Sequence, residues 1–129
     1  SAVRDVYGSL ARAAETVTTE IAEANTDSRA NYQALTDAET VETAQQALFA
    51  SLLEVQVGTD AAYESWLDDH PEYAVEFAGT EPVPNRAWHP VRPSETVVAV
   101  SFQDAPDAAV AAVQRQAFGR HYRSILETE

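Results

Sequence analysis

The sequence predicts an α+β fold: a small antiparallel sheet of three to four strands packed by helices, with N-terminal helices before the sheet and a long C-terminal helix. Three observations indicate this. Apolar residues recur at helical spacing before residue 53, short alternating segments crowd residues 54–102, and helical spacing returns over residues 104–126. Short strands in succession, joined by short loops, favour antiparallel pairing with the helices on one face of the sheet.

Residues 1–24 are predicted to form a helix, because apolar residues alternate at spacings of four and three. This heptad seam either packs against the rest of the same domain or forms a homodimer contact. Asn25 ends the helix, and Asp27 or Ser28 is placed to cap a short turn that runs to Leu35. The seam consists of Val3, Tyr7, Leu10, Ala14, Val17, Ile21 and Ala24.

A second helix is predicted from Thr36, whose side chain caps the first turn while Glu39 completes a capping box. Near Leu53 its pattern gives way to a short alternating strand that ends at Gly58. Thr59 then caps a third helix, which ends near residue 69. The residues that this helix buries are Tyr63, Trp66 and Leu67.

Three further strands are expected before the final helix. Residues 73–77 alternate, residues 86–89 form a short strand, and residues 96–102 are the most strand-like run of the chain. The final helix has Pro106 in its first turn and runs to about Leu126. Its apolar face holds Val110, Val113, Ala117, His121, Tyr122 and Ile125.

The composition indicates one halophilic domain. Among 129 residues, 21 Asp and Glu face 8 basic residues, all of them Arg, so the formal charge is −13. The carboxylates are spread along the chain, Lys is absent and Ala is abundant. This pattern is typical of a cytoplasm with molar KCl, where the Debye length falls to about 3 Å and self-repulsion is screened. We expect a single domain, with residues 1–35 as an N-terminal helical segment and residues 36–129 as the α+β core.

Several function classes are excluded. The chain has no Cys, so disulfides, thiolate catalysis and Cys-based metal centres are impossible. No apolar run reaches the roughly 18 residues of a membrane span, and we expect no signal peptide. The four glycines are isolated, so no phosphate-binding loop can be built, and no serine has the glycines of a nucleophile elbow. We therefore expect no metal, no cofactor and no catalytic residue.

Two stretches depart from the acidic background: residues 83–94 and 108–126 contain no acid and hold five of the eight arginines. If the strand with Trp88 lies beside the last helix, they form a cationic patch with an aromatic neighbour. Arginines grip carboxylates or phosphates bidentately, and a tryptophan stacks on a base or ring. The candidate binding residues are Arg86, Trp88, His89, Arg92, Arg115, Arg120, His121 and Arg123.

Several segments carry a resemblance to a known family. They are residues 41–44 and 47–55, residues 57–59 with Trp66, the Trp88-His89 pair, and residues 115–120 with Tyr122 and Arg123. Together they resemble a small haloarchaeal family that is described only as a domain of unknown function, over nearly the whole chain. The resemblance implies one domain, supports the halophilic expectation and brings no activity, cofactor or catalytic residue. Members carry residues ahead of this start, so we expect Ser1 to be a trimmed end.

Two functions are left open. The first is a non-catalytic interaction module of the cytoplasm, which binds a protein partner through the Arg/Trp patch or through the face of the N-terminal helix. Nucleic acid and membrane are disfavoured as partners. The alternative is an enzyme or a small-anion-binding protein that uses His89, His121 and nearby arginines in a pocket between the sheet and the last helix. A purely structural role also explains the arginines, because they favour a helix C-terminus and pair with neighbouring carboxylates.

Overall fold

The computed structural model describes residues 2–25, 38–79 and 83–128. They form two compact units, the first within residues 1–52 and the second over Leu53–Thr128. The helix that was expected to open the α+β core therefore belongs with the N-terminal helices, while a single domain stays a prediction. The predicted caps Asp27, Ser28 and Thr36, and the short turn to Leu35, lie outside the described residues.

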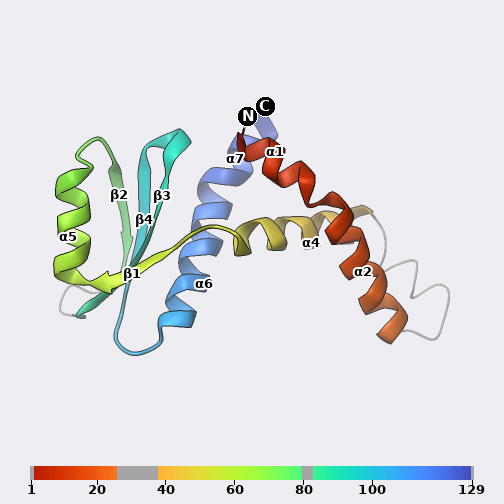
Figure 1. Ribbon diagram of the computed structural model, residues 1–129, viewed down its shortest axis with the longest axis horizontal. Helices are drawn as coiled ribbons and strands as arrows, with labels where there is room; N and C mark the ends of the chain where they lie inside the picture. The colour runs from red at the N-terminus through yellow and green to blue at the C-terminus, as the bar shows by residue number, and fades with distance from the viewer. Residues whose placement is uncertain (1, 26–37, 80–82, 129) are drawn as a thin grey trace. The chain divides into compact units, whose positions relative to one another are not determined.

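The first unit is helical, with α1 (Ala2–Ser9), α2 (Ala11–Asn25) and α4 (Ala38–Ser51) (Figure 1). The predicted helix over residues 1–24 is interrupted at Leu10, whose N–H donates to the Tyr7 carbonyl at 3.1 Å. Beyond the break, α2 packs on α4. Small side chains recur at every fourth position of α2 and are at most 5% exposed: Ala14, Thr18 and Ala22.

The heptad seam of the N-terminal helix is buried only in part. Tyr7 packs edge-on against Phe49 of α4, with ring centroids 5.9 Å apart, and the Gln45 amide donates to the Tyr7 carbonyl at 2.8 Å. Val17 and Ile21, further along the same seam, are 37% and 51% exposed. The buried face of α2 thus follows a spacing of four, because its small residues allow α4 to approach closely there.

The second unit confirms the α+β class. Its sheet has the order β1-β3-β4-β2, and η1 (Arg92–Ser94) joins β3 to β4. The C-terminal helix consists of α6 (Pro106–Ala117), the π-helical segment η2 (Phe118–Tyr122) and α7 (Arg123–Thr128). The remaining elements are β1 (Gln56–Thr59), α5 (Asp60–Asp69), β2 (Ala74–Ala78), β3 (Asn85–Val91) and β4 (Thr96–Phe102).

The sheet is mixed rather than antiparallel throughout. β3 pairs antiparallel with β1 and with β4, but β2 pairs parallel with β4, with Val75 opposite Val97. β3 and β4 form an antiparallel hairpin, and β2 lies at the outer edge of β4 and runs opposite to β3, so it is parallel to β4.

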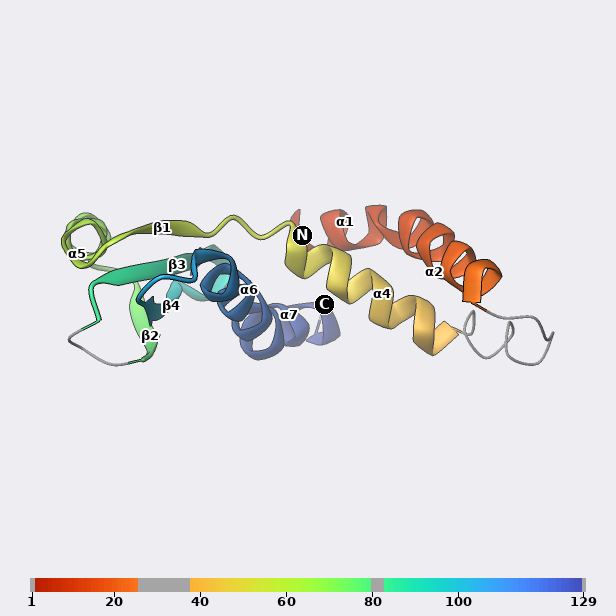
Figure 2. The same cartoon turned by 90° about the horizontal axis from the view of Figure 1, so that it is seen from below.

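Helices cover both faces of this sheet, not one face as expected: α5 lies on one side and α6 on the other (Figure 1, Figure 2). Strand side chains alternate between faces, so the register assigns each residue to one helix. The α5 face holds the core cluster of Tyr63, Trp88, Val97 and Ala99. The opposite face holds the fully buried Val98 and is covered by α6, whose Val113 and Ala117 are also fully buried.

Candidate functional site at the turn between β3 and β4

The turn between β3 and β4 has a constrained backbone. Pro93 occupies an early position of η1, and Glu95 adopts the left-handed conformation with φ 47° and ψ 47°. Glu95 is the one residue other than glycine with positive φ in the part of the chain that the structure describes. Its N–H donates to the Arg92 carbonyl at 3.2 Å, and its carbonyl accepts from the N–H of Ala74 at 2.8 Å. These constraints fix the positions of Arg92 and Ser94.

The C-terminal helix meets this turn through its π-helical segment, Phe118–Tyr122. Such single wide turns inside α-helices occur frequently at functional sites. Here the wide turn carries His121 and Tyr122, and both side chains contact the sheet or the turn. Gly119 lies between them and α6, exposed to solvent.

His89 and Tyr122 form a buried polar pair behind the turn. The His89 Nδ1–H donates to the Glu54 carbonyl at 2.6 Å, so Nε2 accepts from the Tyr122 hydroxyl at 2.7 Å. Burial lowers the pKa of His89, although the bond to the Glu54 carbonyl raises it. Burial also raises the pKa of Tyr122 to about 12. Both groups are therefore neutral near pH 7, and His89 has no ring nitrogen left for a ligand.

His121 joins the helix to the edge strand and to the turn. Its Nε2 lies 3.0 Å from the Glu76 Oε2 atom of β2, and its Nδ1 lies 3.4 Å from the Ser94 hydroxyl. The side chains of His121 and Glu76 are 13% and 32% exposed. Glu76 is unusual, because every other acidic residue that the structure describes is exposed.

Four of the predicted binding residues are exposed cations of this turn or of the C-terminal helix, and we call them the arginine surface: Arg92, Arg115, Arg120 and Arg123. Arg92 follows β3, and its charge acts on both His89 and Tyr122. The other three lie within nine residues of the C-terminal helix, and the Arg123 guanidinium lies 5.4 Å from the Phe118 ring centroid. Within the described residues, none of the four forms an ion pair with a carboxylate.

The structure separates Arg86 and Trp88 from the other predicted site residues. Their strand, β3, does lie beside the last helix. Side chains alternate along it, so Arg86 and Trp88 face α5 while His89 and Val91 face the last helix. Trp88 is 3% exposed and packs on Tyr63 at a ring-centroid distance of 5.3 Å, so its ring is covered. Arg86, 1% exposed, contacts Asp60 at 3.4 Å and lies over the Phe77 ring.

Sequence reasoning missed the residues that complete the cluster at the turn. Glu76 sits in an alternating strand like many solvated carboxylates, and Ser94 follows Pro93 in a segment with no motif of its own. Tyr122 was placed on the apolar face of the last helix, which is correct, but its bond to His89 joins positions 33 residues apart. Local patterns carry no signal for such a pair.

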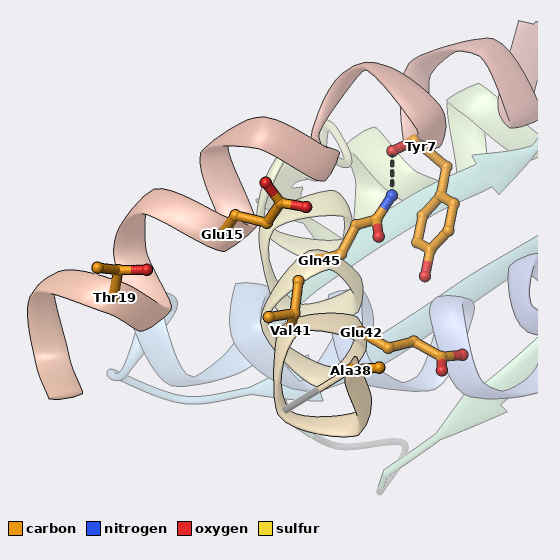
Figure 3. Close-up of a pocket in the computed structure, with 7 residues that line it drawn as sticks. All are labelled: Tyr7, Glu15, Thr19, Ala38, Val41, Glu42 and Gln45. Atoms are coloured by element: carbon orange, nitrogen blue, oxygen red, sulfur yellow. Dashed lines mark hydrogen bonds between the residues drawn. The ribbon is translucent and has the colours of Figure 1, made fainter. Parts of the chain in front are cut away.

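A broader concave surface lies in the first unit. A groove of about 630 Å³ runs between α1, α2 and α4, lined among others by Tyr7, Thr19, Gln45 and the carboxylates of Glu15 and Glu42 (Figure 3). Burial, and then the charge of Glu42, raise the pKa of Tyr7. Among the described residues that line this groove none is basic, and none of the predicted binding residues lies in it.

Comparison with known proteins gives one match. The model of a family of unknown function (DUF5809) covers residues 1–123. No curated protein and no solved structure matches the chain. Among the described residues, no helix has both the length and the apolar character needed to cross a membrane.

Proposed function

This chain belongs to a family of unknown function, DUF5809, and we propose that it is a binding module whose arginine surface binds an acidic protein partner. One observation carries the proposal. In a chain with 21 acidic residues and 8 arginines, Arg92 of the turn and three arginines of the C-terminal helix are exposed without an ion pair to a described carboxylate. Guanidinium groups bind carboxylates through two parallel hydrogen bonds, so such a surface fits clustered Asp and Glu side chains.

An acidic protein fits this surface better than a nucleic acid does. Binding of single strands relies on aromatic side chains that stack on bases, and Trp88 is covered by Tyr63 and the sheet. Nucleic-acid affinity also depends on counterion release and is lost in concentrated salt. Pairs with carboxylates are also screened by salt, but a protein partner can add packing contacts that salt does not weaken.

We also propose that the chain works in a high-salt cytoplasm of a haloarchaeon. The proposal is supported by the charge of −13, the absence of Lys, and the exposure of every described carboxylate except Glu76. A face of α2 supports a second contact, between two copies of the chain. Val17 and Ile21 lie one turn apart on α2 and are both exposed to solvent.

The alternative of a small-anion site or an enzyme pocket between sheet and helix is less well supported. Its central residue, His89, is 7% exposed and bonded through both ring nitrogens. Arg92 remains available to a small anion at the same turn. Competition by a small dicarboxylate in the binding assay distinguishes this alternative from a protein partner.

The proposal is tested by titrating a fluorescent poly-glutamate peptide into the folded chain at constant salt. Replacing both Arg120 and Arg123 by Ala is expected to weaken binding by about tenfold or more, because two bidentate contacts are removed. Arg12→Ala, an exposed arginine of α2, is the matched control and leaves the affinity unchanged. Equal affinity of the double variant and the wild type, or tighter binding of an RNA oligonucleotide than of the peptide, overturns the proposal.

A further inference from the structure

The turn between β3 and β4 holds a second arrangement, which the binding function does not use. Ser94 ends η1, His121 comes from the π-helical segment, and Glu76 comes from β2. The His121 ring lies between the other two side chains, 3.4 Å from the Ser94 hydroxyl and 3.0 Å from the Glu76 carboxylate. A hydroxyl, an imidazole and a carboxylate in this order are the parts of an activated nucleophile.

The partners of the neutral His121 ring select its tautomer. The Glu76 carboxylate only accepts hydrogen bonds, so the neighbouring Nε2 of His121 carries the hydrogen and donates it. The lone pair of Nδ1 then faces the Ser94 hydroxyl, as a general base must. The roles of the two ring nitrogens are exchanged relative to the common serine triad, but the proton path is equivalent. The Ser94 hydroxyl also donates to the Val91 carbonyl at 3.4 Å, so it must rotate toward Nδ1 before the proton transfer, and catalytic hydrogen bonds are often long before a substrate binds.

The three side chains differ in exposure as a nucleophile, its base and a supporting carboxylate require. Ser94 is exposed and can be reached by a substrate, His121 is mostly buried, and Glu76 is the half-buried carboxylate of the described chain. The left-handed Glu95 directly follows Ser94, and backbone strain of this kind clusters at active sites. The turn, the edge strand β2 and the π-helical segment thus bring these three side chains together at the Ser94 hydroxyl.

We propose that Ser94 is a nucleophile for acyl transfer from activated esters, with His121 as its general base and Glu76 as the positioning residue. The Ser94 oxygen forms a bond to the ester carbonyl carbon while its proton passes to His121 Nδ1. The bond from that carbon to the leaving oxygen then breaks, and the alcohol or phenol leaves with the proton. Water releases the acid from Ser94 by the same steps, with His121 again taking the proton of the attacking oxygen.

Two other serines provide matched controls. The hydroxyls of Ser9 and Ser51 are exposed and donate to carbonyls of their own helices, at 2.6 Å from Val6 and 2.7 Å from Leu48. Both are exposed, as Ser94 is, and these bonds tie them to the backbone of their own helices. The chain has no Lys, so the common competing site of acylation is missing.

The test treats the full chain with 4-nitrophenyl acetate, follows nitrophenolate release, and locates the acetyl group by mass spectrometry of peptides. Acetylation is expected at Ser94 and not at Ser9 or Ser51. Ser94→Ala and His121→Asn are expected to lower release to the buffer rate. Ser51→Ala leaves release unchanged, and far-UV circular dichroism verifies the fold of each variant.

The role of Glu76 needs its own measurement, since a structural contact would also be lost on substitution. Glu76→Gln is expected to slow acetylation at Ser94 by about tenfold or more, and Glu76→Asp, which keeps a carboxylate, to recover much of the rate. The rates of both variants and of the wild type are measured at one temperature, at which all three proteins are folded. Acetyl groups spread evenly over Ser9, Ser51 and Ser94, or an unchanged rate in Ser94→Ala, overturn the proposal. Peptide binding by Ser94→Ala tests the arginine surface independently.

Discussion

His89 has a structural role that its position in the sequence does not reveal. Its place beside Trp88, in an acid-free stretch, predicted a binding residue, but the fold buries its side chain and gives both ring nitrogens a hydrogen-bond partner. A buried donor or acceptor without its partner costs about 1–3 kcal/mol. The bond from Tyr122 therefore stabilises the junction of the sheet and the C-terminal helix, and two predictions follow from it at this scale.

Tyr122→Phe is expected to lower the free energy of unfolding by about 1–3 kcal/mol, because Nε2 of His89 loses its donor inside the protein. Urea unfolding at constant salt measures the effect. Tyr73→Phe, which removes the hydroxyl of a half-buried tyrosine, serves as the control and should change stability less. Equal stability of Tyr122→Phe and the wild type would show that water satisfies His89.

The pH dependence of stability has a defined sign at His89. Burial lowers its pKa in the folded state below the ordinary value of 6.5, so the unfolded chain binds a proton first as the pH falls. The stabilising contribution is complete above pH 6.5 and is lost progressively below it. We expect His89→Gln to have a smaller loss of stability between pH 7 and 5 than the wild type has, measured by urea unfolding. Parallel curves for the two proteins would contradict the assignment.

At the scale of elements, the backbone requires glycine at one position and tolerates a side chain at another. Gly79, which follows β2, has φ +139°, and a Cβ there would lie 2.0 Å from the Ser101 hydroxyl. Gly119, in the π-helical segment, has nothing within 4 Å of that position. Gly79→Ala is expected to destabilise the fold by about 1–3 kcal/mol, and Gly119→Ala to stabilise it by about 0.4–1 kcal/mol. Thermal unfolding measures both, and a destabilising Gly119→Ala would indicate that the wide turn requires glycine.

Elements with strong local signals were predictable from the sequence. The helix Asp60–Asp69 and the strand Thr96–Phe102 have the predicted bounds, and the Thr59 hydroxyl accepts from the Ala62 N–H at 3.2 Å as a cap should. The parallel pairing of β2 and the helix on the second sheet face were not predictable, because each depends on contacts between distant segments. The same limit applies to the site. Composition identified the arginines. Which side chains of β3 face α5, Trp88 among them, depends on the packing of the whole sheet.

For the whole molecule, charge is the dominant property. The chain carries −13, and the described carboxylates other than Glu76 face solvent without many cations to pair them. Dialysis into dilute buffer lengthens the Debye length and unscreens their repulsion, so we expect the fold to loosen. Far-UV circular dichroism at decreasing KCl concentration measures this. An unchanged spectrum after dialysis would contradict the halophilic proposal.

The central claim is that the chain binds an acidic partner through the arginine surface. The most direct measurement maps the backbone amide signals by nuclear magnetic resonance while poly-glutamate is added to the chain at constant high salt. We predict that the largest shifts occur at Arg92 and over residues 115–123. The double variant with Arg120→Ala and Arg123→Ala is expected to lose them. Shifts centred on α2 or on the groove of the first unit, or no saturable shift at all, would contradict it.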